Sequence, residues 1–351
     1  MEERKDALGL LDCITAPGFC VSDNRIIKVN AAAAALFFEE GMDIMQMLPS
    51  GMEEYRHFTK GCLYLTVQKD SICWNAAVTQ HQGTHVFLLE PDTARPELQA
   101  LALAARELRT PLNNAMLMAN KLLEQQDPEV LDSVSRLNRG LYQMLRIVGN
   151  MSDAAYTPGQ IRHTLHDISR VMDEIFQKVQ SLTEAAGLTL TFSGSPEPIY
   201  TLCDPDQLER AVMNILSNAI KFTPRGGTID AAFSRSNQIL RLTIRDSGSG
   251  IAENLMRTIF YRYQRQSALE DSRYGIGLGM VLIHSSALQH GGTVLIDSPE
   301  GGGTRVTLTM KIRQEEPKLS AKIIRPVSGG YDPGLIEFSE VLPAEMYNGK
   351  K

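Results

Sequence analysis

Three polar side chains in the second half of the chain are spaced to share one face of a helix. Asn214, Asn218 and Lys221 stand at positions i, i+4 and i+7, and residues at this spacing lie along one side of a helix. The amide oxygen of Asn218 is a hard ligand suited to Mg²⁺ that bridges phosphates, with Asn214 in support and Lys221 adding positive charge. These residues indicate a site for a phosphorylated ligand.

A carboxylate follows at the end of a predicted strand. Asp246 closes the strand predicted over 239–246 and enters a turn that contains Gly248 and Gly250. Glycine permits positive φ and a close approach of the backbone to a ligand. The carboxylate of Asp246 is a suitable acceptor for the exocyclic amine of adenine.

Two glycine-rich segments complete the pattern. Gly275, Gly277 and Gly279 precede a helix predicted over 281–289. Their backbone N–H groups would face phosphates, aided by the positive end of that helix, and the loop would act as a lid. The last segment runs from Glu300 to Thr304 between two predicted strands.

The four segments have a joint meaning that none has alone. A lone GxGxG is weak, and an Asn-rich helix face is often only a surface. All four in this order, over about ninety residues, resemble the Bergerat-type ATPase superfamily, with the sub-pattern of its histidine kinases. Ile259 to Arg265 also resembles their phenylalanine box, from which Arg262 or Arg265 would reach a γ-phosphate.

This resemblance implies ATP and Mg²⁺ as cofactors, with Asn218 as the Mg²⁺ ligand. The implied nucleotide-binding residues are Asn214, Asn218, Lys221, Asp246, Gly248, Gly250, Arg262, Arg265, Gly275, Gly277, Gly279 and Thr304.

An earlier segment, Ala105 to Leu112, reads ARELRTPL and resembles the phosphoacceptor box of sensor histidine kinases, usually (S)HELRTPL. Arg106 stands at the acceptor position, and a guanidinium stays protonated without a usable lone pair. Glu107 resembles the acidic residue that helps to deprotonate the acceptor. Thr110 resembles the residue that helps to position water for dephosphorylating a response regulator.

The resemblance therefore implies a sensor histidine kinase-like signal transduction protein that does not autophosphorylate at the usual site. We expect a response-regulator phosphatase or a regulatory role. One alternative is a non-catalytic ATP-binding partner of an active kinase. Another is a kinase with a different acceptor, for which the candidates are His163, His166, His284 and His290, although none lies in an acceptor-like box. A serine kinase of the anti-sigma type fits less well, because such proteins resemble the ATPase domain alone.

A heptad pattern surrounds Arg106 and predicts a helical hairpin. Its first helix carries Leu98, Leu101, Ala105, Leu108, Leu112, Ala115, Ala119 and Leu122, and its second carries Leu131, Val134, Leu137, Leu141, Met144, Val148 and Met151. One hairpin cannot bury both apolar stripes, so two chains are expected to form a dimeric four-helix bundle. Pro111 should bend the first helix locally.

The N-terminal segment resembles a PAS domain. Strands are predicted over 18–22, 25–30, 62–67, 71–79 and 84–89, with a short helix over 31–38 after Asn30. The fold class expected for the whole chain is α+β multidomain. Its parts are a PAS-like α/β sensor (1–90), a linker and dimerisation hairpin (91–155), an α/β-sandwich ATP-binding domain (156–313) and a flexible tail (314–351), whose apolar Leu335 to Phe338 leaves docking open.

Composition narrows the partners. The net charge of −6 argues against nucleic acid. No run of about eighteen apolar residues and no convincing signal peptide occurs, so a cytoplasmic protein without a membrane span is expected. The five cysteines form no CxxC pair and suit buried thiols in a reducing compartment. The expected partners are a second copy of the chain, a response regulator receiver domain and, in the alternative, an active kinase.

Overall fold

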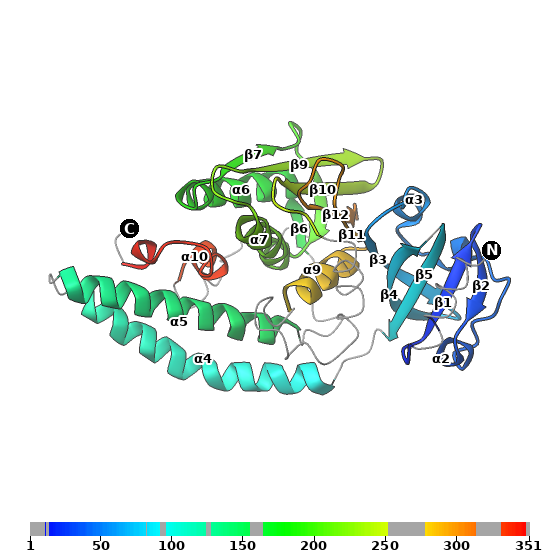
Figure 1. Ribbon diagram of the computed structural model, residues 1–351, viewed down its shortest axis with the longest axis horizontal. Coiled ribbons are helices and arrows are strands. Elements are labelled where there is room, and N and C mark those ends of the chain that lie inside the picture. Colours follow the sequence, from blue (N-terminus) through cyan, green and yellow to red (C-terminus); the bar gives the residue numbers. More distant parts are fainter. Residues whose placement is uncertain are drawn as a thin grey trace.

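A computed structural model describes residues 11, 14–81, 83–91, 96–123, 128–154, 164–251, 278–313 and 331–348 (Figure 1). These residues form a β-rich N-terminal domain, a helical hairpin, an α/β domain and a C-terminal segment. The predicted α+β multidomain class is therefore confirmed at this level.

The N-terminal domain contains the five strands expected from the sequence, in the antiparallel order β2-β1-β5-β4-β3. Its elements are β1 (Gly18–Ser22), β2 (Arg25–Val29), α2 (Ala31–Ala34), η1 (Ile44–Met47), α3 (Met52–Arg56), β3 (Cys62–Lys69), β4 (Ile72–His81) and β5 (Thr84–Pro91). The helix predicted over 31–38 is shorter than expected. Phe37 has a φ of 60°, which a helix cannot continue through.

Asn30 fixes the junction between β2 and α2. Its buried side chain accepts hydrogen bonds from the N–H groups of Gly18 (3.1 Å) and Ala33 (2.9 Å) and donates to the carbonyls of Ile14 and Ala16. An asparagine is suited to this place because it can donate and accept at once. The neighbouring core is aromatic, with Phe19 stacked on Phe38 and Phe87.

The helical hairpin consists of α4 (Pro96–Leu122) and α5 (Pro128–Ala154). The helix α4 continues through Pro111 without a break. The predicted seam is only partly covered within the chain. Ala105, Leu112, Ala119, Val134, Leu141 and Val148 are buried, whereas Leu108, Leu122, Leu137 and Met144 are 41–50 % exposed.

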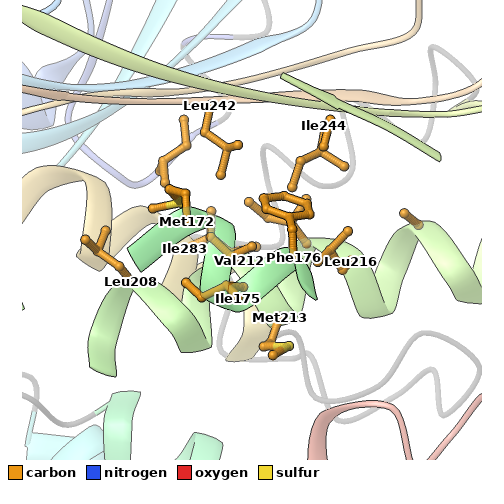
Figure 2. Close-up of a cluster of buried hydrophobic side chains, with 14 of the residues drawn as sticks. Met172, Ile175, Phe176, Leu208, Val212, Met213, Leu216, Leu242, Ile244 and Ile283 are labelled. Atoms are coloured by element: carbon orange, nitrogen blue, oxygen red, sulfur yellow. The ribbon is translucent and has the colours of Figure 1, made fainter. Parts of the chain in front are cut away.

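The α/β domain places three helices on one face of a sheet. Its elements are β6 (Thr164–Asp167), α6 (Ile168–Ala185), β7 (Thr189–Ser193), β8 (Tyr200–Cys203), α7 (Pro205–Phe222), β9 (Thr228–Ser236), β10 (Ile239–Asp246), α9 (Leu278–Gln289), β11 (Val294–Asp297) and β12 (Arg305–Lys311). Figure 2 shows apolar side chains of α6, α7 and α9 meeting Leu242 and Ile244 of β10. Burial of this layer holds α7 against the sheet.

One sheet runs through both domains. Its ten strands follow the order β2-β1-β5-β4-β3-β11-β12-β10-β9-β7, and β3 pairs antiparallel with β11 from Cys62↔Ile296 to Tyr64↔Val294. Gly61 permits this approach, because a β-carbon there would overlap the carbonyl oxygen of Ile296. The sequence patterns predict strands in each of the two domains, but they do not predict that β3 and β11 join these strands into one sheet.

The C-terminal segment, residues 331–348, corrects the prediction of a flexible tail for the part of 314–351 that the structure describes. It contains α10 (Pro333–Glu337) and η3 (Ala344–Tyr347). Asp332 caps α10 by accepting from the N–H groups of Gly334 and Leu335, and Pro333 suits the first helical turn. Phe338, Leu342 and Tyr347 are buried, so the apolar patch noted in the sequence docks on the rest of the chain.

Candidate nucleotide-binding site

The helix α7 presents the three polar residues singled out in the sequence. Asp204 starts the helix by accepting from the N–H of Gln207 at 3.1 Å. Asn214 is buried and donates to the carbonyl of Arg210 at 3.0 Å. Asn218 is exposed although residues on either side of it are buried, and Lys221 lies one turn further on. The exposed amide of Asn218 thus lies at the edge of the buried layer, where a ligand could reach it.

Asp246 organises the turn that follows β10. Its buried carboxylate accepts through Oδ1 from the N–H of Gly248 (2.8 Å) and from that of Thr304 (3.1 Å). A β-carbon on Gly248 would overlap the carbonyl oxygen of Phe222, at the end of α7. The turn is therefore held between α7 and the start of β12, and the side chain of Asp246 is fixed in direction.

The glycines of two predicted segments meet at this turn. Gly250 has a φ of +71°, and a β-carbon on it would lie 2.9 Å from the carbonyl oxygen of Gly303. Gly301, Gly302 and Gly303 also have positive φ. The structure therefore brings Asp246, Gly248, Gly250 and Thr304 together, as the sequence predicts, and the glycines are needed for backbone packing.

Gly279 brings the third segment to α7. A β-carbon at this position would lie 2.9 Å from Oδ1 of Asn214, so the start of α9 lies against α7. Four predicted nucleotide-binding residues, namely Arg262, Arg265, Gly275 and Gly277, lie outside the described residues.

The segment that resembles a phosphoacceptor box, residues 105–112, lies on another element. Arg106, Glu107 and Thr110 are all exposed on α4, the helix that packs against α5. Neither Arg106 nor Glu107 belongs to the cluster around Asp246. These three side chains therefore lie at the surface of the hairpin.

The histidines considered as alternative acceptors contact neighbouring groups of the fold. His290 is buried, with Nδ1 2.7 Å from the carbonyl of Ser286 and Nε2 accepting from the N–H of Asp204 at 3.1 Å. His284 is buried against the ring of Tyr64, and His166 lies 2.6 Å from the hydroxyl of Thr164. His163 lies outside the described residues. Both ring nitrogens of His290 are therefore engaged, Nδ1 with Ser286 of α9 and Nε2 with Asp204 at the start of α7.

Sequence reasoning missed the contact between the nucleotide-binding helix and the C-terminal segment. Nζ of Lys221 lies 2.9 Å from Oε2 of Glu340, and the hydroxyl of Ser217 donates to the carbonyl of Glu337 at 3.0 Å. The apolar Leu335 to Phe338 signalled docking but not its place. Glu340 lies more than one hundred residues from Lys221 in the sequence. Sequence spacing therefore gives no indication that the two residues are in contact.

Other kinds of site receive little support from the described part of the chain. Within it, no group of three or more His, Cys, Asp or Glu residues could hold a metal ion. Cys62 and Cys203 are buried free thiols, and burial raises the pKa of Cys62 to about 12. The same described residues contain no helix with the length and apolar character that a bilayer span requires.

Comparison with protein families identifies the type of the α/β domain. Residues 203–314 match the family described as histidine kinase-, DNA gyrase B- and HSP90-like ATPase. The match spans every nucleotide-binding residue predicted from the sequence, from Asn214 to Thr304. Residues 203–314, which make up most of the α/β domain, are therefore similar to the ATPase domains of this family.

Curated relatives extend the similarity beyond the length of the family match. Histidine protein kinase DivJ of Caulobacter vibrioides is 26 % identical over 236 residues, which are 63 % of this chain and 40 % of that protein. Sensor histidine kinase ZraS of Escherichia coli O157:H7 is 28 % identical over 217 residues, or 59 % of this chain and 44 % of the relative. The chain thus spans less than half the length of both relatives.

Among solved structures, full-length ShkA in complex with AMPPNP superposes with a TM-score of 0.50 at 22 % identity. The match covers 62 % of this chain and 46 % of that one. It shows that the two proteins share a fold over this region.

Proposed function

We propose that this chain is a sensor histidine kinase-like signal transducer that binds ATP with Mg²⁺ and does not phosphorylate itself at position 106. It would instead dephosphorylate a response regulator or regulate a partner through its nucleotide state. The observation that carries the proposal is the contrast between two places. The cluster around Asp246 is assembled, whereas the exposed group at the acceptor position of α4 is a guanidinium.

The nucleotide would bind with its adenine near Asp246 and its phosphates near α7. The carboxylate of Asp246, held through Oδ1 by two N–H groups, would accept from the exocyclic amine of adenine. The glycines at positions 248 and 250 let the turn pack against Phe222 and Gly303, which would hold Asp246 in place for this contact. Lys221, and Arg262 or Arg265 by resemblance, would bind phosphate oxygens through charge-assisted hydrogen bonds.

The chemistry of the described residues fits Mg²⁺ that is bound largely by the ligand. Mg²⁺ keeps several waters and often takes only one or two protein oxygens in addition to substrate phosphates. The exposed amide of Asn218 offers one such oxygen, with Asn214 beneath it. In this proposal Asn218 would hold the metal, which would supply charge screening of the phosphates, and the loop with Gly275, Gly277 and Gly279 would close over the phosphates.

The hairpin would form a four-helix bundle with a second copy of the chain. The exposed members of the predicted seam, including Leu108 and Leu137, lie beside the buried ones on α4 and α5. An unpaired stripe of this kind favours association. The N-terminal domain, with the strand order described above, would serve as a PAS-like sensor for this cytoplasmic dimer.

A receiver domain would approach the surface of α4. Phosphoryl transfer to the chain requires a nucleophile, which Arg106 does not supply. Removal of phosphate from a receiver requires only a positioned water, for which the exposed hydroxyl of Thr110 is suited, and Glu107 offers a neighbouring carboxylate.

The test combines two measurements on the purified protein. With radiolabelled ATP and Mg²⁺, no acid-labile phosphate should appear on the chain. With a phosphorylated receiver domain, the protein should shorten the phosphate lifetime, and Thr110→Ala should reduce this effect at least tenfold (about 1.4 kcal/mol). Asn114→Ala, an exposed amide truncation one turn along α4, is the matched control.

Two outcomes would decide against parts of the proposal. Acid-labile phosphohistidine on the wild-type chain would exclude the loss of autophosphorylation. ATP binding together with an unchanged receiver lifetime would favour the alternative, a non-catalytic ATP-binding partner of an active kinase.

A further inference from the structure

The C-terminal segment, residues 331–348, touches both the hairpin and the ATPase domain. On the hairpin side, the amide of Asn138 donates to the carbonyl of Tyr347 at 3.1 Å, and the amide of Gln143 donates to that of Ser339 at 3.0 Å. On the ATPase side, Ser217 donates to the carbonyl of Glu337. Figure 1 shows α10 lying between α5 and α7.

Apolar contacts on both sides support these hydrogen bonds. Phe338 and Leu342 belong to the buried core of the ATPase domain, and Ile336 belongs to that of the hairpin. The ring of Tyr347 meets that of Tyr142 edge-on at 5.0 Å. The segment is therefore docked by specific packing, and its removal would uncover apolar surface on both domains.

Two acids of the segment form ion pairs, and one of them, Glu340, binds a cation from each domain. Glu340 contacts Nη1 of Arg146 on α5 at 3.0 Å and Nζ of Lys221 on α7 at 2.9 Å. Glu337 contacts Nε of Arg146 at 3.3 Å. Burial alone would raise the pKa of Glu340, but Lys221 and Arg146 outweigh it and lower that pKa. The negatively charged carboxylate of Glu340 thus contacts Lys221, the lysine that is expected to bind phosphate.

We propose that residues 331–348 act as an internal competitor of the nucleotide, with the carboxylate of Glu340 occupying Lys221 in place of phosphate oxygens. Docking of the segment and binding of ATP oppose each other, because Lys221 cannot serve both anions at full strength. Since the same segment holds α5 against α7, its release frees the ATPase domain to move relative to the hairpin. This inference rests on the proposed ATP site.

The first test measures ATP affinity in the full chain by titration calorimetry with Mg²⁺ present. Glu340→Gln removes the negative charge that faces Lys221 and should tighten ATP binding about two- to fivefold, the range expected for a partly exposed ion pair. Glu345→Gln is the matched control, because Glu345 is an exposed acid of the same segment. It should leave the affinity unchanged.

The second test follows the segment itself. Hydrogen exchange of amides in residues 332–347 should accelerate when ATP is added to the wild-type chain, because nucleotide displaces the segment. Phe338→Ala, which weakens docking without touching Lys221, should both raise the basal exchange and tighten ATP binding.

The outcomes separate this inference from the proposed function. Equal ATP affinity for the wild-type chain, Glu340→Gln and Phe338→Ala, with exchange unaffected by ATP, would overturn the competition and leave the ATP site standing. Absence of ATP binding in all three would overturn both.

Discussion

Gly303 lies so close to Asp246 that a β-carbon on it would overlap the carbonyl oxygen of Asp246. Gly303 also has a φ of +81°, a conformation that costs other residues about 1–2 kcal/mol. Gly303→Ala should therefore lower the free energy of unfolding by at least about 2 kcal/mol, measured by urea denaturation. Gly226→Ala is the matched control. Gly226 has a φ of +84° with no atom within 4 Å of the added carbon, so it should show the backbone cost alone.

Asp246→Asn tests the adenine contact with little change in shape. The amide can still accept from the N–H groups of Gly248 and Thr304 through its oxygen, but it loses the charge and presents a donor toward the adenine amine. ATP affinity should fall at least tenfold, or about 1.4 kcal/mol, by calorimetry. The control is Asp230→Asn. Asp230 is an exposed acid on β9 that accepts a hydrogen bond from the hydroxyl of Thr191, and the variant should bind ATP normally. An unaltered affinity in Asp246→Asn would place the adenine elsewhere.

Arg106→His restores the residue type that phosphotransfer requires. Because Arg106 is exposed on α4, the exchange should fold normally. Acid-labile label from radioactive ATP should appear on the variant and be missing from the wild-type chain and from Arg106→Gln. If Arg106→His stays unlabelled while it binds ATP, more than the acceptor has been lost.

Leu108→Glu should weaken the proposed dimer. Leu108 is half exposed within one chain and belongs to the predicted seam, so a charge there would be buried on association at a large cost. Sedimentation should show a shift from dimer to monomer. Leu103→Glu introduces the same charge at an exposed leucine outside that seam and should leave the dimer intact. A wild-type monomer would refute the four-helix bundle.

The N-terminal domain should lose stability as the pH falls through the range below 6.5. Burial lowers the pKa of His85 from its ordinary 6.5, with a backbone hydrogen bond at Phe58 opposing in part, and its Nδ1 lies 2.9 Å from the Tyr55 hydroxyl. The unfolded chain then binds more protons than the folded one, so acidification favours unfolding. Urea unfolding at pH 7.5 and 5.5, followed by the single tryptophan, Trp74, should show this loss. In His85→Gln the loss should be smaller; an equal loss would exclude His85 as its cause.

Local patterns predicted the elements well. Alternating and helical periodicity gave the five N-terminal strands, the hairpin and the helix that carries Asn214, Asn218 and Lys221, because each depends on side chains close together in the chain. The glycine-rich turns around Asp246 were also expected, because glycine at positions 248 and 250 by itself indicates a positive φ or a close approach of the backbone. Within the described residues, Asp246, Gly248, Gly250 and Thr304 are brought together as predicted.

Contacts between distant segments could not be predicted. The pairing of Glu340 with Lys221 and that of β3 with β11 join residues whose types are ordinary in their own surroundings. The helix predicted after Asn30 was also too long, because the left-handed conformation of Phe37 leaves no trace in hydrophobic periodicity. These features depend on the tertiary arrangement, which periodicity within a single segment does not encode.

The pairing of β3 with β11 has a consequence for how the two domains protect each other. Both strands are outermost in their own half of the ten-stranded sheet, so separation would leave each with unpaired N–H and C=O groups. Open edges of this kind recruit strands from other molecules. Each domain therefore shields the other from aggregation, and a fragment cut between them would carry an adhesive edge that the intact chain conceals.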